Sequence, residues 1–156
     1  QQMAHRLQDW ARVGEQTETV IAIKAHVGGA LHTPEDALWL LKQADSKWIR
    51  LNYDFSHFQL WGFELEKSLE QLLPYTVFIH VKDGRGDPKR VQFLLPGEGN
   101  IDYDQYAAIL AKHKYNGMVV VEVSGQIHKK PGYNPEKAAR KSYEHLSSAF
   151  KVNGPS

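Results

Sequence analysis

The residues Tyr75-Thr76-Val77-Phe78-Ile79-His80-Val81-Lys82 form an apolar run that ends in a histidine and a lysine. Three further runs of this kind occupy residues 19–26, 47–54 and 117–124. Each run predicts a β-strand, because it is rich in branched and aromatic residues and its two faces differ in polarity. Segments with helical periodicity separate the runs, and the alternation of strand and helix is typical of a parallel α/β sheet.

The two faces of these strands have different characters, since side chains alternate along a strand. One face suits packing beneath helices and carries Ile21, Ile23, Ile49, Leu51, Val77, Ile79, Val119 and Val121. The opposite face is too polar for a sealed core and carries Lys24, Arg50, Asn52, Asp54, His80, Lys82, Glu122 and Ser124. In a (β/α)8 TIM barrel this face points inward, and the C-terminal strand ends hold the chemistry. We therefore expect Lys24, Asp54, His80 and Glu122 to face one another.

Helix signals fill the intervals between the runs. Thr33-Pro34-Glu35-Asp36 combines an N-cap threonine with proline at the first helical position and acidic residues in the first turn. The pattern predicts helices over residues 1–13, 33–44, 62–73, 103–113 and 134–150, and loops over residues 83–90, 96–100 and 125–133. The fold class is therefore α/β, and residues 1–156 are expected to form a single unit of about four β/α units preceded by a helix.

Composition narrows the functional classes. The formal net charge of +1 gives no general attraction to nucleic acid or to an anionic membrane. The absence of cysteine excludes disulfides, thiolate metal sites and thiol nucleophiles within this sequence. Neither a long apolar segment nor a signal-like N-terminus is present, so we expect no membrane insertion. The compartment stays open, with the cytoplasm preferred.

Four motifs carry a resemblance to a known family. They are Asp54-Phe55-Ser56-His57, Ile79-His80-Val81-Lys82-Asp83, the turn over residues 95–102 and the strand over residues 115–122. In their order and spacing the chain resembles the xylose isomerase-like TIM barrels, which comprise sugar phosphate isomerases and epimerases and the apurinic endonuclease family 2. The resemblance covers nearly the whole chain and implies that it supplies strands five to eight, the C-terminal half of a barrel.

The resemblance also implies a metal centre and a sugar substrate. In that family, strands five to eight bind one divalent metal through a glutamate, an aspartate, a histidine and a second glutamate. By position, Asp54, His80 and Glu122 match the last three ligands, and His57 matches a histidine that contacts the substrate. The implied cofactor is a divalent metal, Mn, Mg, Co or Zn, and the implied partner is a small sugar or sugar phosphate.

Lys24 stands where the family pattern has the first glutamate ligand. A protonated lysine cannot coordinate a metal, and a divalent cation repels it. Three interpretations stay open: His26 supplies a nitrogen ligand, water or substrate fills the vacancy, or Lys24 replaces the charge of the metal by pairing with Asp54 and Glu122. Three protein ligands with solvent form an acceptable open catalytic site, so we expect metal binding.

The same residues suggest proton transfer next to a carbonyl group. We expect Glu122 to act as ligand and base, and Lys24 to act as an acid, as a base if its pKa is depressed, or as an oxyanion partner. Because Lys24 replaces one carboxylate, epimerisation by two carboxylates is not supported, whereas isomerisation, one-sided epimerisation and elimination remain. His57 is the third candidate catalytic residue, and substrate contacts are expected from His57, Lys82, Arg85 and His26.

Two alternatives to this enzyme stay open. The polar face can be a satisfied ion-pair network in a metal-free carbohydrate-binding or interaction module. In that case Arg50 would pair with Asp54, or Lys24 with Glu122. The poorer alternative is an endonuclease-type phosphodiesterase. That branch of the family needs an Asp-x-His arrangement after the third strand, and this chain has no histidine in residues 83–90.

Four strands cannot close an eight-stranded barrel, so the inner face and two sheet edges need a cover. We expect either a missing N-terminal half-barrel or a second copy of this chain to supply it. The chain starts inside the first expected helix without an N-cap, which indicates that its natural beginning is missing.

Overall fold

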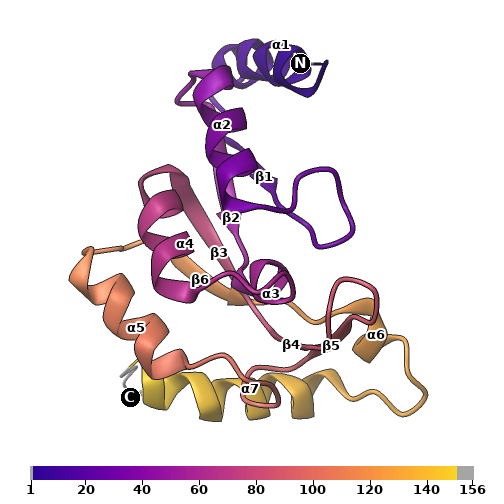
Figure 1. Cartoon of the computed structure of the whole chain (residues 1–156). Helices are drawn as coiled ribbons and strands as arrows, with labels where there is room; N and C mark the ends of the chain where they lie inside the picture. The colour runs from indigo at the N-terminus through magenta and orange to yellow at the C-terminus, as the bar shows by residue number, and fades with distance from the viewer. Residues whose placement is uncertain (1, 151–156) are drawn as a thin grey trace.

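Parallel strands and helices alternate in the computed structural model, which describes residues 2–150 (Figure 1). The main sheet consists of β1 (Ile21–Lys24), β2 (Ile49–Tyr53), β3 (Thr76–Val81) and β6 (Met118–Val121). Its strand order is β1-β2-β3-β6, and each neighbouring pair is parallel. The predicted α/β class and the parallel arrangement are confirmed.

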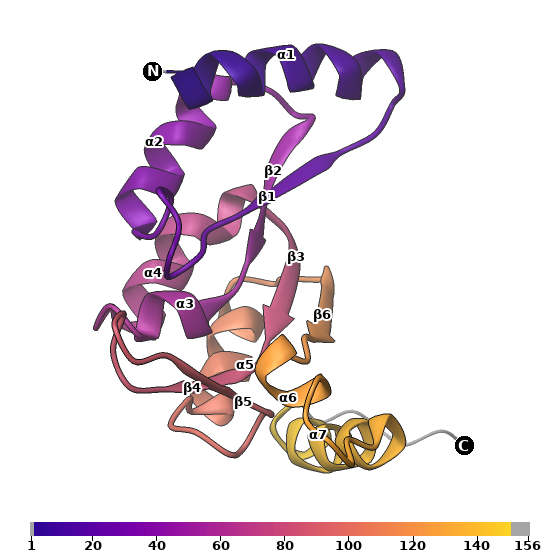
Figure 2. The same cartoon turned by 90° about the vertical axis from the view of Figure 1, so that its right-hand side faces the viewer.

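The helices of the described residues connect or flank these strands and differ in length. The longer ones are α1 (Gln2–Gln16), α2 (Pro34–Ala44), α4 (Leu65–Leu72), α5 (Tyr103–Lys112) and α7 (Pro135–Ala149), and the shorter ones are α3 (Phe55–Gln59), η1 (Leu73–Tyr75) and α6 (Gly125–His128). Figure 2 shows α2 and α4 on the same side of β1, β2 and β3. As predicted, Thr33 caps α2, since its hydroxyl oxygen accepts from the N–H of Asp36 at 3.0 Å. No helix within residues 2–150 is long and apolar enough to cross a membrane.

The core lies between the helices and the apolar face of the sheet. Buried side chains come from β2, β3, α2 and α4, among them Ile49, Leu51, Ile79, Leu40, Leu69 and Leu72. Removing such side chains from water is the main stabilising contribution, about 1.5–3 kcal/mol for each. The predicted alternation of the strands is thus confirmed for β2.

Val77 departs from the prediction that it packs beneath the helices, because its side chain is 41% exposed. The register between β2 and β3 shifts at this point: Leu51 pairs with Thr76, and Asn52 pairs with Phe78. Val77 is therefore an extra residue, as in a β-bulge, and its side chain turns away from the core. After the bulge Ile79 returns to the buried face.

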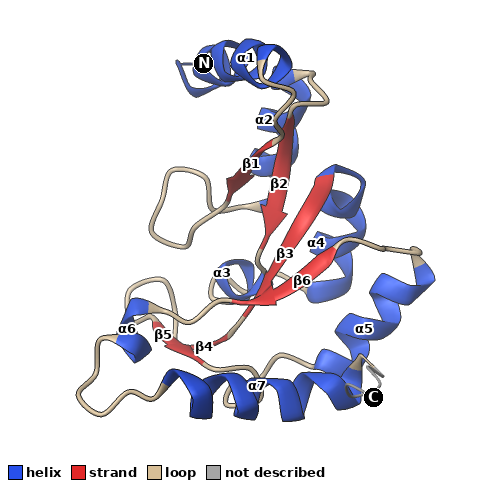
Figure 3. Cartoon of the chain, turned by 180° about the vertical axis from the view of Figure 1, so that it is seen from behind, coloured by secondary structure: helices blue, strands red, loops and turns tan. Residues whose placement is uncertain are grey.

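The opposite face of the sheet has no cover within residues 2–150. Side chains of this face are half-buried or exposed, namely Ala22, Lys24, Arg50, Asn52, Phe78, His80 and Val120. Figure 3 shows β1 and β6 at the two ends of the sheet, and in the described part of the chain neither has a second strand beside it. The four strands thus form an open section of barrel wall.

A short hairpin follows β3 where the sequence predicted a solvated loop. Its strands are β4 (Asp83–Arg85) and β5 (Gln92–Leu94), which pair antiparallel. The carboxylate of Asp83 accepts hydrogen bonds from the backbone N–H groups of Gly97 at 2.7 Å, Gly99 at 2.9 Å and Ile101 at 3.2 Å. These bonds tie the hairpin to the turn before α5, and they depend on residues that are distant in sequence.

Two further elements differ from the sequence predictions. The helix expected over residues 62–73 begins only at Leu65, because Gly62 has a φ of +83° and ends the preceding turn. The short helix α6 lies within the loop expected over residues 125–133, and the Ser124 side chain caps it by accepting from Gln126 N–H. Both features extend over only a few residues, which is too short for hydrophobic periodicity to predict them.

Replacing Asp83 with asparagine is expected to destabilise the protein. An amide keeps only one of the two acceptor oxygens, so at least one buried N–H donor loses its partner, and we expect a loss of about 2 kcal/mol in the free energy of unfolding. Urea unfolding measures this loss. Asp9→Asn, on the exposed face of α1, is the control and should change stability by less than about 0.5 kcal/mol. Equal stability of the two variants would contradict the anchoring role of Asp83.

Candidate functional site

Four charged side chains meet where the strands of the main sheet end. Lys24 ends β1, Asp54 follows β2, Lys82 follows β3, and Glu122 follows β6. Lys24 Nζ lies 2.8 Å from Asp54 Oδ2 and 2.5 Å from Glu122 Oε2. Lys82 Nζ lies 2.5 Å from Glu122 Oε2 and also pairs with Asp54 Oδ2. These four residues are called the strand-end cluster below.

Asp54 is oriented by the first turn of α3. Its Oδ1 atom accepts from the backbone N–H of Ser56 at 3.2 Å and from the Ser56 hydroxyl at 2.7 Å. As the N-cap of α3, Asp54 therefore has one oxygen fixed by the helix. The other oxygen, Oδ2, remains for the two lysines.

His80 joins the cluster from β3. Its Nδ1 atom lies 3.2 Å from Lys24 Nζ and 3.2 Å from Asn52 Nδ2, and it lies 3.7 Å from Glu122 Oε2. Both nitrogen neighbours are donors, so Nδ1 acts as the acceptor and the ring proton belongs on Nε2. Burial and the nearby Lys24 cation lower the pKa of His80, which keeps the imidazole neutral.

His57 lies deeper than His80, and its residue is 1% exposed. Its Nδ1 atom accepts from the backbone N–H of Val27 at 3.2 Å, and its Nε2 atom lies 3.2 Å from Lys82 Nζ. Burial lowers the pKa of His57 to about 3, against the opposing charge of Asp54, so the ring is neutral at pH 7. The ring of His26 lies above it, with centroids 4.2 Å apart.

The strand-end cluster and the histidines beside it form an inner and an outer layer. His57 and Lys82 form the inner layer, because His57 is 1% and Lys82 is 2% exposed. His26 is exposed, and Lys24 and Glu122 keep 20% and 35% of their side-chain surface. Substrate contact was predicted for His57 and Lys82, yet the groups that reach the surface are those of the outer layer. Lys82 contacts Asp54, Glu122 and His57 from the buried side, and substrate contact by His57 and Lys82 stays a prediction.

Two arginines do not join the cluster. Arg85 is exposed on β4, and its Nη2 atom donates to the backbone oxygen of Glu98 at 2.6 Å. Arg50 donates to the backbone oxygens of Ser46 and Ile49, near the start of β2. The alternative pairing of Arg50 with Asp54 was therefore wrong, whereas the pairing of Lys24 with Glu122 is present.

The carboxylates and ammonium groups stabilise one another in their charged forms. Burial alone would raise the pKa of Asp54, but the Lys82 and Lys24 cations outweigh it and hold this pKa below its usual range. Glu122 has a lowered pKa for the same reason, since hydrogen bonds from both lysines overcome its burial. Burial would lower the pKa of Lys24, but Asp54 and Glu122 raise it. In the metal-free cluster the pKa of Lys24 is therefore raised rather than depressed.

Three of these side chains can hold a metal ion. Asp54, His80 and Glu122 each offer one ligand atom, and these atoms lie within 4.8 Å of one another. Two carboxylate oxygens and a neutral imidazole nitrogen suit a divalent transition metal. The donor set thus fits such an ion, although the ammonium of Lys24 lies among the donors.

Nearly the whole sequence of the chain matches one protein family. A model of the xylose isomerase-like TIM barrel family matches residues 1–149. The chain belongs to the xylose isomerase-like TIM barrel family. The resemblance inferred from the four motifs is thereby confirmed, together with the TIM-barrel type of the open sheet.

Relatives and solved structures of this family agree with the assignment. The inosose dehydratase of Salmonella typhimurium (strain LT2) is 27% identical over 146 residues, which cover 84% of this chain and 48% of that protein. A xylose isomerase domain protein from Planctomyces limnophilus has a TM-score of 0.80 at 17% identity, over 95% of this chain and 52% of that one. The IolI protein with a bound zinc atom has a TM-score of 0.79 at 20% identity, over 96% and 55% of the two chains. This chain spans about half the length of the curated relatives that it matches.

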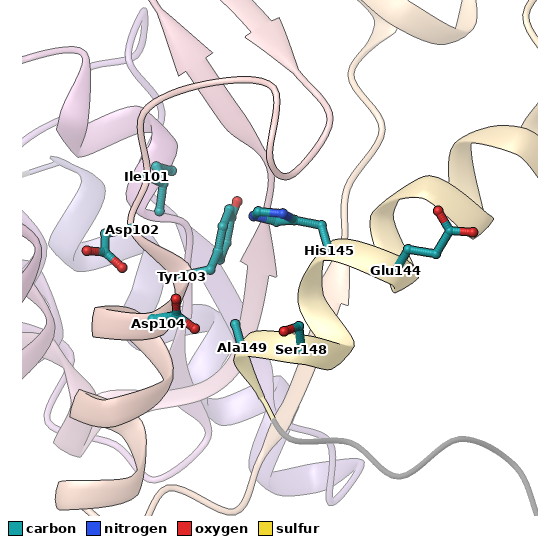
Figure 4. A pocket seen from close by; sticks show the side chains of 8 residues that line it. All are labelled: Ile101, Asp102, Tyr103, Asp104, Glu144, His145, Ser148 and Ala149. Atoms are coloured by element: carbon teal, nitrogen blue, oxygen red, sulfur yellow. The ribbon is translucent and has the colours of Figure 1, made fainter.

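A separate cavity of about 300 Å³ lies between the start of α5 and the last turns of α7 (Figure 4). Its lining consists of Ile101, Asp102, Tyr103, Asp104, Glu144, His145, Ser148 and Ala149. The rings of Tyr103 and His145 meet edge to face across it, with centroids 5.5 Å apart. No residue of the strand-end cluster contributes to this lining, so the cavity is separate from the cluster.

The buried neutral state of His57 predicts an acid-sensitive stability. Between pH 6.5 and about 3 the unfolded chain binds a proton at this residue that the folded protein does not bind, so stability is lost as the pH falls through this range. Lowering the pH from 6.5 to 5 should remove about 2 kcal/mol of folding free energy through this group.

Urea unfolding at several pH values tests this dependence. His57→Gln keeps an acceptor for the Val27 N–H, and its stability should fall less steeply with pH than that of the parent protein. His5→Gln, on the exposed face of α1, is the control and should follow the parent protein. The same slope in His57→Gln as in the parent would contradict the neutral buried ring.

Proposed function

We propose that the barrel containing this chain is a sugar-modifying enzyme that transfers a proton next to a carbonyl group. Isomerisation, epimerisation and dehydration of keto sugars share this first step, which needs a base at the carbon and positive charge at the carbonyl oxygen. The name of the Salmonella relative, an inosose dehydratase, supports a small carbonyl-bearing cyclic polyol or sugar as substrate. The observation that carries the proposal is the position of Glu122 beside two cations.

Glu122 is the proposed base. Its lowered pKa keeps it ionised at neutral pH, and 35% of its side chain faces the open side of the sheet. A carboxylate of low pKa is a weak base, so the substrate must be made more acidic where its carbonyl oxygen binds. Lys82 Nζ donates to Glu122 Oε2 at 2.5 Å from the buried side, and this contact orients the Glu122 carboxylate.

The positive charge that stabilises the carbonyl oxygen would come from a bound metal or from Lys24. When bound by Asp54, His80 and Glu122, a divalent metal would polarise the carbonyl group as a Lewis acid. Lys24 lies beside these donors and His26 lies against His57, and both are proposed to bind sugar hydroxyls or to donate a proton. Arg85 stays a proposed phosphate contact, although it donates to the loop at Glu98.

The complete site needs more than this chain. The sheet is open at β1 and β6, and the chain spans about half the length of its curated relatives. We infer that the other half of the barrel, or a second copy of this chain, covers the open face and supplies further substrate contacts.

A metal-free sugar-binding module is the second candidate. The observation that favours it is the balance of the cluster, in which two ammonium groups and two carboxylates pair without remaining charge. Such a network is stable without a metal and without turnover. The two candidates differ in whether substrate protons exchange with solvent.

Solvent exchange tests the enzymatic proposal. The complete barrel that contains this chain is incubated in D2O with keto sugars and inososes, and loss of the proton next to the carbonyl is followed by NMR. We expect Glu122→Gln to slow this exchange about 100-fold or more, because the amide cannot accept the proton. Glu136→Gln, on the exposed face of α7, should exchange at the rate of the parent protein. Binding of a keto sugar without exchange by the parent protein would contradict the proposal and favour the metal-free module.

A further inference from the structure

Lys24 contacts every donor of the candidate metal site. Its Nζ atom lies 2.8 Å from Asp54 Oδ2, 2.5 Å from Glu122 Oε2 and 3.2 Å from His80 Nδ1. These are the three residues whose ligand atoms lie within 4.8 Å of one another. The ammonium nitrogen therefore occupies a position within reach of all three donors.

Lys82 does not share this property, although it is also bound to both carboxylates. It approaches Asp54 and Glu122 from the buried side, and its third polar neighbour is His57, at 3.2 Å from Nε2. Its side chain is 2% exposed, whereas that of Lys24 is 20% exposed. Only the Lys24 ammonium lies among the three donors on the open side of the cluster.

The charges of the cluster decide what can share this position. Two carboxylates and two ammonium groups balance one another when Lys24 is present. Adding a divalent ion next to Lys24 would leave two unbalanced positive charges at distances of a few Å, which is costly at a half-buried site. The ion and the Lys24 ammonium therefore exclude each other by space and by charge.

The backbone of Lys24 is held by the sheet, but its side chain can turn away from the three donors. Residue 24 pairs with Asn52 in the parallel register of β1 and β2, so the Cα position is set by the sheet. Strand β1 is an edge of the sheet in the described part of the chain, and the side chain has four rotatable bonds. The ammonium can leave the donors without any change in the strand.

We propose that the Lys24 ammonium is a tethered cation that occupies the metal position, so that a divalent ion binds to Asp54, His80 and Glu122 only by displacing it. This inference rests on the proposed function, because it concerns the same donors. It makes residue 24 the determinant of metal affinity in this chain. A glutamate at this position would turn a competitor into a fourth ligand.

Manganese titration tests the inference without any turnover. Mn²⁺ is added to the protein and its variants, and the free ion is followed by electron paramagnetic resonance. Lys24→Met and Lys24→Gln remove the competing charge, and Lys24→Glu adds a carboxylate. Lys67→Met is the matched control, since this exposed lysine on α4 pairs with Glu64 at 2.7 Å.

We expect the Kd for Mn²⁺ to fall about tenfold or more in Lys24→Met and Lys24→Gln, and further in Lys24→Glu. It should be unchanged in Lys67→Met, and adding Asp54→Ala to Lys24→Glu should abolish the gain. Equal affinity in the parent protein and all Lys24 variants would overturn the inference and leave the proposed metal site standing. No binding in any variant, Lys24→Glu included, would overturn both the inference and the metal part of the proposed function.

Discussion

Asp54 and Glu122 each lie between the same two lysine ammonium groups, and the open end of the sheet depends on this arrangement. A carboxylate as buried as Asp54 would be strongly destabilising without a cation beside it. Lys82 supplies that cation from the buried side, and Lys24 supplies a second one from the open side of the sheet. Because each lysine contacts both carboxylates, the geometry of all four side chains is coupled.

Parallel topology brings these groups together. Because all four strands point the same way, the residues at their C-terminal ends meet at one edge although they are far apart in sequence. The following turns then set the direction of each group. Asp54 is fixed as the N-cap of α3, and the stretch after Lys82 is fixed by the three hydrogen bonds to Asp83. The buried side of the site is thus held by these hydrogen bonds, whereas the side chains of Lys24 and Glu122 are partly exposed.

The sequence predicted this edge because strand alternation and chain order are local signals, and they place Lys24, Asp54, His80 and Glu122 on one face. It did not predict which charges pair. Arg50 lies on the same face as Asp54 but bonds to carbonyl groups near the start of its strand, since it lies one residue after the beginning of β2. The burial of Lys82, the bulge at residue 77 and the hairpin at residues 83–94 arise from contacts between distant segments, which periodicity does not encode.

The most direct test of the account is a crystal structure of the protein soaked in Mn²⁺, with anomalous diffraction recorded to locate the ion. We expect a manganese peak between Asp54, His80 and Glu122 and a Lys24 ammonium that has moved away from all three. Lys82 should keep its contacts with both carboxylates. A manganese ion at these donors with the Lys24 ammonium still in contact with them would contradict this expectation.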